Sequence, residues 1–438
     1  MSYNKVGALR FVEENDVRFI RLQFCDLLGN LKNISISPSQ LNKAFDEGIA
    51  FDGSSIQGFS SIEDSELFLY PDPTTLCILP WRPQQGKVAR LFCNIKKADG
   101  SPFEGDCRYI LKTIFEKAKS QGLIFHVGAE CEFFLFQMDS EGKPILKPAD
   151  EATYFDVAPL DQGENTRREI CLTLEQMGFD IESSHHESAF GQHKIDFKYT
   201  DGLKSADNIL SFKNVVKTIA GRNGLYASFM PKPLMNVSGS GMYINMSLFK
   251  QGENIFSSKH NEGLSDIAKH FIAGILSHIK EITAICNPTI NSYKRIYSDY
   301  KAPKHITWSY QNRSTLIRVP ATLEGHNRIE LRSPDNTCNP YLTLALILAS
   351  GLDGINSKLE LIPTLIPNAY SLSTQELVDL NIDVLPSNLN EALALMKNSH
   401  FVKSTLGEHT FTNYIATKEN EWQFYNHTIH DWEIQNYL

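Results

Sequence analysis

The sequence predicts an α+β fold, with a small N-terminal sheet domain followed by a larger domain in which a curved antiparallel sheet is backed by helices. Segments that alternate apolar and polar residues occur in both parts of the chain, and segments with helical periodicity lie between them after residue 106. Turn-forming residues cluster at 97–106, and a chain of 438 residues is longer than most single domains. We therefore predict two domains, at 1–103 and 104–438.

The N-terminal part begins with a charged amphipathic helix within residues 1–17 and continues with strands. Arg18–Cys25 alternates cleanly, and Asp26–Asn30 has the composition of a hairpin turn. Val88–Ile95 is another strand-like run. Phe51–Phe59 is rich in glycine and serine, which indicates an ordered loop. Together these elements predict a small sheet domain.

Helical periodicity recurs through the second part, and roughly the last 70 residues are helical and charged. The periodic segments before that region are Cys107–Gln121, Thr166–Met177, Ser205–Asn223, Gly263–Ile285 and Pro340–Lys358. The final segment, His427–Leu438, carries Trp432 and Tyr437 among charges. Aromatic residues are enriched where proteins meet, so we predict that this segment contacts another subunit or a partner.

Four strand-like segments of the second part carry polar side chains on one face. They are Val127–Phe136, His193–Tyr199, Met242–Leu248 and Arg328–Ser333. Because side chains alternate across a strand, each segment has one apolar face that packs in a core and one polar face. The polar faces contain Glu130 and Glu132; Lys194, Asp196 and Lys198; Tyr243, Asn245 and Ser247; and Arg328, Glu330 and Arg332. Buried charge is costly unless compensated, so these faces require water, a partner or an ion.

Composition excludes several classes of protein. A net charge of −9 argues against direct nucleic-acid binding, because phosphate neutralisation needs a basic surface. No segment approaches the roughly 18 apolar residues of a membrane span, and the N-terminus lacks the apolar centre of a signal peptide. The eight cysteines are scattered without a Cys-x-x-Cys pair, which is typical of a reduced cytoplasmic protein.

A series of short strings, in order along the chain, resembles the motifs of one enzyme family. They are FDGSS (51–55), PFEGDCR (102–108), ECEFFLF (130–136), SHHE (184–187), GQHKIDFKY (191–199), MPKPL (230–234), SGSGMY (238–243), NPTINSYKR (287–295), NRSTLIRVP (312–320) and RIELRS (328–333). From about residue 18 to the C-terminus, the chain resembles a type I glutamine synthetase of the shorter form, which lacks the adenylylation insert.

This resemblance implies a β-grasp-like N-terminal domain, a glutamine synthetase catalytic-type domain and a homo-oligomer in which two hexameric rings form a dodecamer. It implies an ATP-dependent ligase in which ATP phosphorylates the side-chain carboxylate of glutamate and ammonia displaces the phosphate. Divalent metals, Mg²⁺ or Mn²⁺, would screen the phosphates, and arginines would stabilise the charge on the transferred group. An acidic side chain would take a proton from ammonium.

Many functional positions of the family are retained. The resemblance assigns Glu130 and Glu330 to the nucleotide-side metal, Glu132 and Glu187 to the other metal, Arg313, Arg318 and Arg328 to phosphate, Arg295 and Arg332 to substrate glutamate, Gly239 to a close backbone approach to substrate, Ser247 to the nucleotide, and Asp52 to the ammonium site of a neighbouring subunit. It also implies that Glu130 and Glu132 face into the site.

The departures fall on the chemistry. The family's GQHE has become GQHK, so Lys194 replaces a metal-binding glutamate. The family's NGSGMH has become SGSGMY, so Tyr243 replaces a metal-binding histidine and Ser238 a substrate-binding asparagine. The flap motif PGYEAP has become SDYKAP, so Lys301 replaces the acid that accepts a proton from ammonium. Each metal site thus loses one of three protein ligands.

These replacements are not neutral. A lysine ammonium has no lone pair to donate and repels a dication, whereas it can pair with the carboxylates Glu132 and Glu187. Tyr243 is a poor magnesium ligand because a phenol is protonated at neutral pH. Lys301 would repel ammonium. We therefore predict weak or absent metal binding.

Two other features lie in or near these motifs. His185 and His186 look like a metal-binding pair, but in this family context we expect them to be hydrogen-bonded structural histidines. Ser61 stands where the Gram-positive enzymes usually carry a regulatory arginine.

Three functions remain open on this basis. The first is a catalytically impaired or inactive relative, a pseudoenzyme with a regulatory or scaffolding role in nitrogen metabolism, which assembles with an active glutamine synthetase paralogue or binds a nitrogen regulator. The second is an ATP-dependent ligase that joins glutamate to another amine. The third is ordinary glutamine synthesis with reduced metal affinity.

Overall fold

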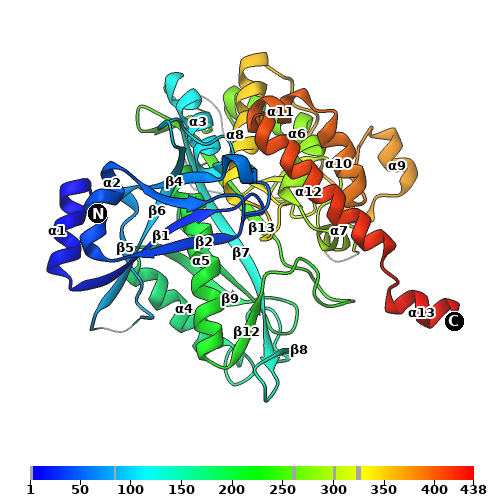
Figure 1. The fold of residues 1–438 in the computed structure, drawn as a ribbon. Coiled ribbons are helices and arrows are strands. Elements are labelled where there is room, and N and C mark those ends of the chain that lie inside the picture. Colours follow the sequence, from blue (N-terminus) through cyan, green and yellow to red (C-terminus); the bar gives the residue numbers. More distant parts are fainter. Residues whose placement is uncertain (1–2, 83–84, 259–262, 299–301, 322–326) are drawn as a thin grey trace.

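The structure is a computed structural model that describes residues 3–82, 85–258, 263–298, 302–321 and 327–438. Two sheets and the helices around them make up the chain (Figure 1). Strands in the N-terminal sheet follow the order β2-β1-β6-β4-β3, and β5 pairs with β6. The elements of this part are α1 (Lys5–Glu14), β1 (Val17–Cys25), β2 (Leu31–Ile36), α2 (Leu41–Asp46), β3 (Ile49–Asp52), β4 (Glu66–Pro71), β5 (Cys77–Ile78) and β6 (Lys87–Lys97). The predicted N-terminal helix and strands are thereby confirmed.

The β1–β2 hairpin also joins the two parts of the chain. The Asp26 side chain accepts hydrogen bonds from the backbone N–H groups of Leu28 and Asn30 and so closes the predicted turn. Gly29 has φ +83°, and a Cβ there would lie 2.9 Å from the Cα of Asn339. Only glycine accepts both this conformation and this contact, so the hairpin tip can rest against the start of α8 (Pro340–Ser357).

The second sheet has the order β15-β16-β17-β13-β7-β10-β9, with β8, β11 and β12 on β7 and β14 on β13. Its strands are β7 (Ile124–Met138), β8 (Pro144–Pro148), β9 (Ile181–His186), β10 (Gln192–Phe197), β11 (Thr200–Asp201), β12 (Leu225–Ser228), β13 (Met242–Lys250), β14 (Glu253–Asn254), β15 (Trp308–Tyr310), β16 (Ile317–Val319) and β17 (Ile329–Leu331). All four predicted polar-faced strands are present. The curved sheet is mixed rather than wholly antiparallel, because β15 and β16 run parallel.

The predicted helices are present with small shifts at their starts. They are α3 (Cys107–Ser120), α4 (Glu164–Gln176), α5 (Gly202–Arg222), α6 (Asp266–Cys286) and α8. Helix α6 begins after Ser265, whose side chain accepts a hydrogen bond from the Ala268 N–H, and α5 begins after Asp201, which caps it in the same way. N-cap side chains therefore set both starts. The remaining helices are α7 (Ile290–Ile296), α9 (Thr374–Asp379), α10 (Leu389–Lys397), α11 (His400–Leu406), α12 (Glu408–His427) and α13 (Asp431–Tyr437).

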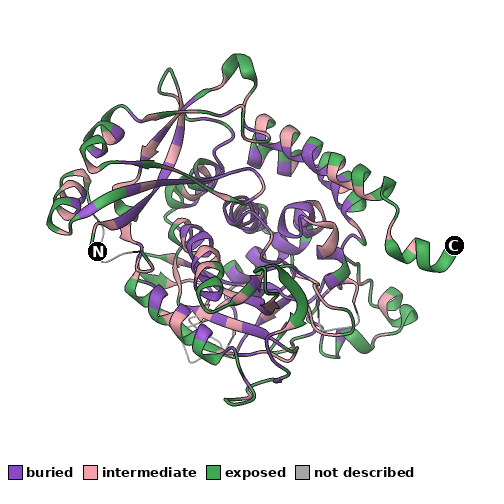
Figure 2. Cartoon of the chain, turned by 60° about the horizontal axis from the view of Figure 1, so that its bottom comes forward, coloured by how far each residue is buried: buried purple, intermediate pink, exposed green. Residues whose placement is uncertain are grey.

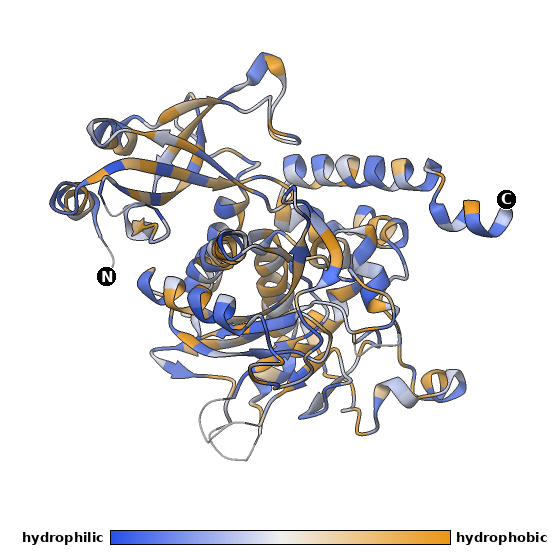
Figure 3. Cartoon of the chain, turned by 90° about the horizontal axis from the view of Figure 1, so that it is seen from below, coloured by the Kyte–Doolittle hydropathy of each residue, from blue (hydrophilic) through white to orange (hydrophobic). Residues whose placement is uncertain are grey.

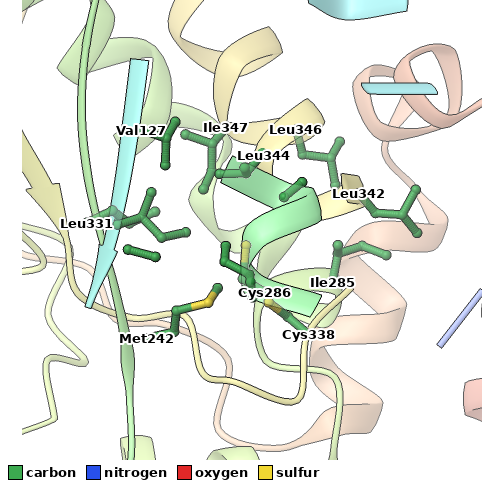
Figure 4. Close-up of a cluster of buried hydrophobic side chains, with 14 of the residues drawn as sticks. Val127, Met242, Ile285, Cys286, Leu331, Cys338, Leu342, Leu344, Leu346 and Ile347 are labelled. Carbon is green, nitrogen blue, oxygen red and sulfur yellow. The ribbon is translucent and has the colours of Figure 1, made fainter. Parts of the chain in front are cut away.

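The main core lies between the second sheet and the helices α6 and α8. Figure 4 shows Val127, Met242 and Leu331 from the sheet facing Leu344 and Ile347 from α8. Two glycines let the helices approach closely: a Cβ on Gly274 would lie 2.1 Å from the Ser350 carbonyl oxygen, and one on Gly354 would lie 2.1 Å from the His270 carbonyl oxygen. The crossing of α6 and α8 supports the sheet whose opposite face carries the polar side chains.

The C-terminal helix α13 extends away from the rest of the chain (Figures 1 and 3). Its residues are mostly exposed, including the large side chains of Trp432 and Tyr437 (Figure 2). Within the described residues, no helix is both long and apolar enough to cross a membrane.

Candidate active-site cavity

A cavity of about 530 Å³ opens over the polar face of the second sheet. It is lined by Glu132, Tyr154, Glu187, Ser188, Gln192, Lys194, Ser238, Gly239, Tyr243, Arg295, Ala302, Asn312, Arg313, Ser314, Arg332, Asn368 and Tyr370. Strand register brings the predicted faces together: Lys194 lies opposite Glu132 across β10 and β7, and Tyr243 lies opposite Glu130 across β13 and β7. The alternation seen in the sequence thus places charged groups from β7 and β10 and the polar side chains of β13 on one surface.

Lys194 forms several ion pairs in this surface: the predicted pair with Glu187 is present, but the shortest pair is with Glu130, which was not predicted. Its Nζ lies 2.8 Å from Oε2 of Glu130, and it is 3.9 Å from carboxylate oxygens of both Glu187 and Asp196. The side chain of Asn245 donates to the other oxygen of Glu130 at 2.8 Å. Burial alone would raise the pKa of Glu130, but the nearby Lys194 ammonium lowers it, so the pair is charged.

The predicted pairing of Lys194 with Glu132 is wrong at the level of atoms. Oε2 of Glu132 instead accepts a hydrogen bond from the backbone N–H of Gly241 at 2.7 Å. Burial and the neighbouring Glu187 raise the pKa of Glu132. This carboxyl group is protonated more easily than an ordinary glutamate and already has a donor, whereas Glu130 is the carboxylate that the ammonium approaches.

Glu330 is held by two arginines. Arg318 donates to Oε2 of Glu330, with Nε at 2.8 Å, and Nε of Arg332 donates to Oε1 at 3.0 Å. Glu330 and Arg332 are both buried, so this cluster carries its own compensating charge. Nη1 of Arg332 is buried without a hydrogen-bond partner among the described residues, which leaves one cationic donor unused beside the cavity.

Tyr243 lies between two cations. The ring centroid is 5.9 Å from Nζ of Lys194 and 5.1 Å from Cζ of Arg332. Burial raises the pKa of its phenol, so it stays protonated and cannot act as an anionic ligand. Its aromatic face stabilises the positive charges that surround it.

The loop before β13 brings backbone close to Arg295. The Arg295 guanidinium donates to the carbonyl oxygens of Ser333, Pro334 and Arg332. A Cβ on Gly241 would lie 2.2 Å from Nη2 of Arg295, and one on Gly239 would lie 2.2 Å from the Pro231 carbonyl oxygen. Both glycines are therefore needed for the shape of this wall.

Several predicted site residues lie outside the cavity lining. Arg328 reaches the site through Asn245, to which its Nε donates at 3.1 Å, while Ser247 is buried further along β13. Asp52 is exposed on the N-terminal sheet, where it accepts hydrogen bonds from Ser54 and Ser55. Lys301 lies outside the described residues.

The two histidines considered as metal ligands are hydrogen-bonded, as predicted. Nε2 of His185 contacts Glu187 at 3.1 Å, and Nε2 of His186 contacts Asp150 at 2.9 Å. His186 belongs to a buried cluster with Asp150, Asp161 and His193. In this cluster the Arg167 guanidinium lies 2.7 Å from Asp161 and 2.9 Å from Nδ1 of His193. Because a guanidinium can only donate, Nδ1 accepts and the His193 proton resides on Nε2, so that ring offers no lone pair to an ion.

Sequence reasoning missed several lining residues. Gln192 donates to the Gly239 carbonyl oxygen at 3.1 Å, and its place two residues before Lys194 on β10 could have revealed it. Tyr370 and Asn368 come from a short 3-10 helix, Ala369–Ser371, and its N-cap, far along the chain, and no local pattern indicates them. The side-chain amide of Asn336 donates hydrogen bonds to the carbonyl oxygens of both Glu132 and Gly241.

The residues present do not fit the two divalent metals that the resemblance implies. Both oxygens of Glu130 and both oxygens of Glu330 are engaged by protein donors, and Lys194 and Tyr243 offer no ligand. Hard cations such as Mg²⁺ need several free oxygen ligands. The cavity is instead rich in cations, with Lys194, Arg295, Arg313 and Arg332 in its wall.

Two family models match the chain. The glutamine synthetase β-grasp domain covers residues 16–98, and the glutamine synthetase catalytic domain covers residues 104–437. Curated proteins named glutamine synthetase from Clostridium saccharobutylicum, Methanosarcina mazei and Staphylococcus aureus are 52%, 51% and 49% identical, and the alignments cover at least 99% of this chain and 97% of each relative.

Solved structures are similar over almost the whole chain. One, described as a GmaS/ADP complex, has a TM-score of 0.89 at 32% identity and covers 98% of both chains. The Plasmodium falciparum glutamine synthetase has a TM-score of 0.89 at 26% identity and covers 100% of this chain and 99% of its own.

Proposed function

Because the chain belongs to the glutamine synthetase family, we propose that it keeps the family's cavity but has replaced the metal ions with its own cations, and that it acts as a regulatory or scaffolding relative of the active enzymes. One observation carries this proposal. Nζ of Lys194, at a position where the resemblance implies a metal-binding carboxylate, lies 2.8 Å from Glu130. The lysine both removes a ligand and neutralises another.

Loss of the metals has a direct chemical consequence. Phosphoryl transfer relies on divalent cations that bridge and neutralise the phosphates. Lys301 would also place positive charge where the family uses a proton acceptor. We therefore expect ATP-dependent glutamine synthesis to be weak or lost, while Arg313, Arg318 and Arg328 leave nucleotide binding possible.

The proposal includes the family's dodecamer of two hexameric rings. Asp52 is exposed and lies outside the cavity lining of its own chain, as expected for a residue that serves a neighbouring subunit. The exposed aromatic residues of α13 are suited to a further contact. An active paralogue or a nitrogen regulator is the proposed partner, and the eight free cysteines support a reducing cytoplasmic location.

A second function is favoured by the relatives. Identities of 48–52% to curated glutamine synthetases suit an ATP-dependent ligase that forms glutamine, or a γ-glutamyl amide from another amine. Under this alternative the Lys194–Glu130 pair would open when substrate and metal bind.

A coupled ATP-hydrolysis assay with glutamate and Mg²⁺ or Mn²⁺ separates the two functions. Ammonium and a panel of primary amines are tested in turn, and the Clostridium saccharobutylicum relative is assayed in parallel as the control. We expect turnover with ammonium to be absent or far below that of the relative, and no turnover above background with any other amine. Turnover with ammonium comparable to that of the relative would end the proposal, and turnover with one other amine alone would establish the second function.

A further inference from the structure

A second cavity, of about 460 Å³, lies apart from the site described above. Its walls come from the tip of the β1–β2 hairpin, helix α5, strand β12 and the residues just before α7. Helix α5 and β12 lie side by side here (Figure 1). A cavity of this size accommodates a small metabolite.

Three lysines line this cavity. Lys213 and Lys217 are one turn apart on α5, and Lys418 comes from α12. Lys418 is paired with Glu421 at 2.7 Å, so its charge is compensated. Among the described residues, Nζ of Lys213 donates to the Asn336 carbonyl oxygen alone, at 2.7 Å, which is a hydrogen bond without a negative charge.

Lys213 and Lys217 lack a counter-ion within the described part of the chain. The lining of this cavity includes no aspartate or glutamate, and neither lysine forms an ion pair with a described residue. Like charges at i and i+4 on a helix repel each other. Partial burial and the neighbouring Lys213 together lower the pKa of Lys217, which reflects this repulsion.

The rest of the lining is neutral and open to a ligand. Tyr226 and Met230 are half exposed at the cavity's edge, and the Nζ of Lys217 lies 5.9 Å from the ring centroid of Phe229. Asn336 separates this cavity from the first one: its carbonyl oxygen accepts from Lys213, and its side-chain amide donates to the Glu132 carbonyl oxygen. Its side-chain Oδ1 is buried without a partner among the described residues.

From this arrangement we infer that the cavity is a binding site for a small anionic metabolite, whose phosphate or carboxylate group sits between the ammonium groups of Lys213 and Lys217. The two ammonium groups, which line the same cavity, would each donate a charge-assisted hydrogen bond to the oxyanion. The anion would supply the negative charge that the cavity wall lacks, and its other groups would contact Tyr226 and the neutral lining.

Lysine acylation followed by mass spectrometry tests this inference on the unmodified full-length protein. The rate is measured in inorganic phosphate, in succinate and in chloride at equal ionic strength. We expect several-fold slower acylation of Lys213 and Lys217 in one of the two oxyanions, with no change at Lys204, which is exposed on the same helix. Protection by phosphate or by succinate identifies the group that binds. Equal rates in all three salts, or equal protection of Lys204, would overturn the inference.

A variant pair gives an independent measurement. Lys217→Gln removes one ammonium from the cavity, and Lys204→Gln makes the same change elsewhere on α5. Calorimetric titration with the protective anion should show roughly tenfold weaker binding for Lys217→Gln and no change for Lys204→Gln, because one charge-assisted hydrogen bond is lost. Circular dichroism checks that both variants fold. Wild-type affinity in Lys217→Gln would place the anion elsewhere.

Discussion

An ammonium group and a divalent cation neutralise carboxylates in different ways. A metal ion accepts lone pairs from several oxygens at once. The Lys194 ammonium instead donates hydrogen bonds from the end of a side chain, and it lies close to a single carboxylate, that of Glu130. The second carboxylate, Glu132, accepts a hydrogen bond from a backbone N–H, and its raised pKa makes it easier to protonate. At the residue scale, the glutamate-to-lysine exchange that the resemblance implies at position 194 would therefore change how its neighbours are charged as well as the number of ligands.

Restoring the ligands should restore metal affinity. The double variant Lys194→Glu, Tyr243→His removes the resident ammonium and returns both side chains that the family uses. We expect Mn²⁺ to bind at least tenfold more tightly than in the unmodified protein, because repulsion is replaced by two ligands. Electron paramagnetic resonance of free Mn²⁺ gives the affinity. Adding Lys301→Glu tests whether activity follows.

The matched control for this experiment is Lys198→Glu, which makes the same change of charge at an exposed lysine paired with Asp180. It should leave Mn²⁺ affinity unchanged. If the double variant binds Mn²⁺ no better than the unmodified protein, the ligand positions are assigned incorrectly.

At the scale of elements, the crossing of α6 and α8 fixes the sheet beneath the cavity. Gly274 and Gly354 face each other there, each against a backbone carbonyl of the other helix. Close-packed interiors respond to added volume by shifting side chains and backbone, which costs about 1–3 kcal/mol and sometimes more. Because neither glycine has a Cβ atom, α6 and α8 can approach each other this closely.

Gly354→Ala should destabilise the protein by at least ~2 kcal/mol, since a Cβ would meet the His270 carbonyl oxygen at 2.1 Å. Gly221→Ala is the control: this glycine is exposed on helix α5, and a Cβ there would have no neighbouring atom within 4 Å among the described residues. There alanine should be neutral or stabilising by about 0.5–1 kcal/mol. Urea unfolding measures both. Equal stability of the two variants would show that α6 and α8 can move apart freely.

At the scale of the whole molecule, a buried ion cluster joins the N-terminal sheet domain to helices α3 and α5 of the second part. Arg108 on α3 donates to both oxygens of Asp207 on α5 at 3.0 Å and to Asp72 of the N-terminal part at 2.9 Å. It also donates to Asn94 on β6. Removing one member of such a cluster leaves another charge buried and uncompensated.

This junction should make stability depend on pH. Burial opposes ionisation of Asp72, but the charge and hydrogen bond of Arg108 and the hydrogen bonds from Thr74 together outweigh it and lower the pKa of Asp72 below its usual 3.8. Its stabilising effect is therefore fully present above about pH 4 and is lost as pH falls through the lower folded-state value. Asp72→Asn should lose about 1–3 kcal/mol at pH 7 and much less at pH 3.

Urea unfolding at the two pH values checks this expectation, with the exposed Asp64→Asn as the control. The control should cost little at either pH. A penalty for Asp72→Asn that is the same at pH 7 and pH 3 would show that the ionised carboxylate is not what joins the domains.

Much of this architecture can be predicted from local patterns. Alternation located two strands of the N-terminal sheet and four strands of the second sheet, and it placed Glu130, Glu132 and Lys194 on one surface, because side-chain direction follows directly from position along a strand. Partner choice could not be predicted in this way. Lys194 stands opposite Glu132 in the register, yet it pairs with Glu130 because Gly241, from another strand connection, already donates to Glu132. Asn336 and Tyr370 reach the site only because segments far apart in the sequence fold together, so no local sequence pattern predicts their roles there.

The tethered charge of Lys194 cannot diffuse away. A cluster of carboxylates that binds metal ions changes its shape and its electric field when a chelator or a low metal concentration removes the ions. If Lys194 takes the place of a metal ion as proposed, the charge in this cavity should stay the same in magnesium-rich and magnesium-starved cells alike.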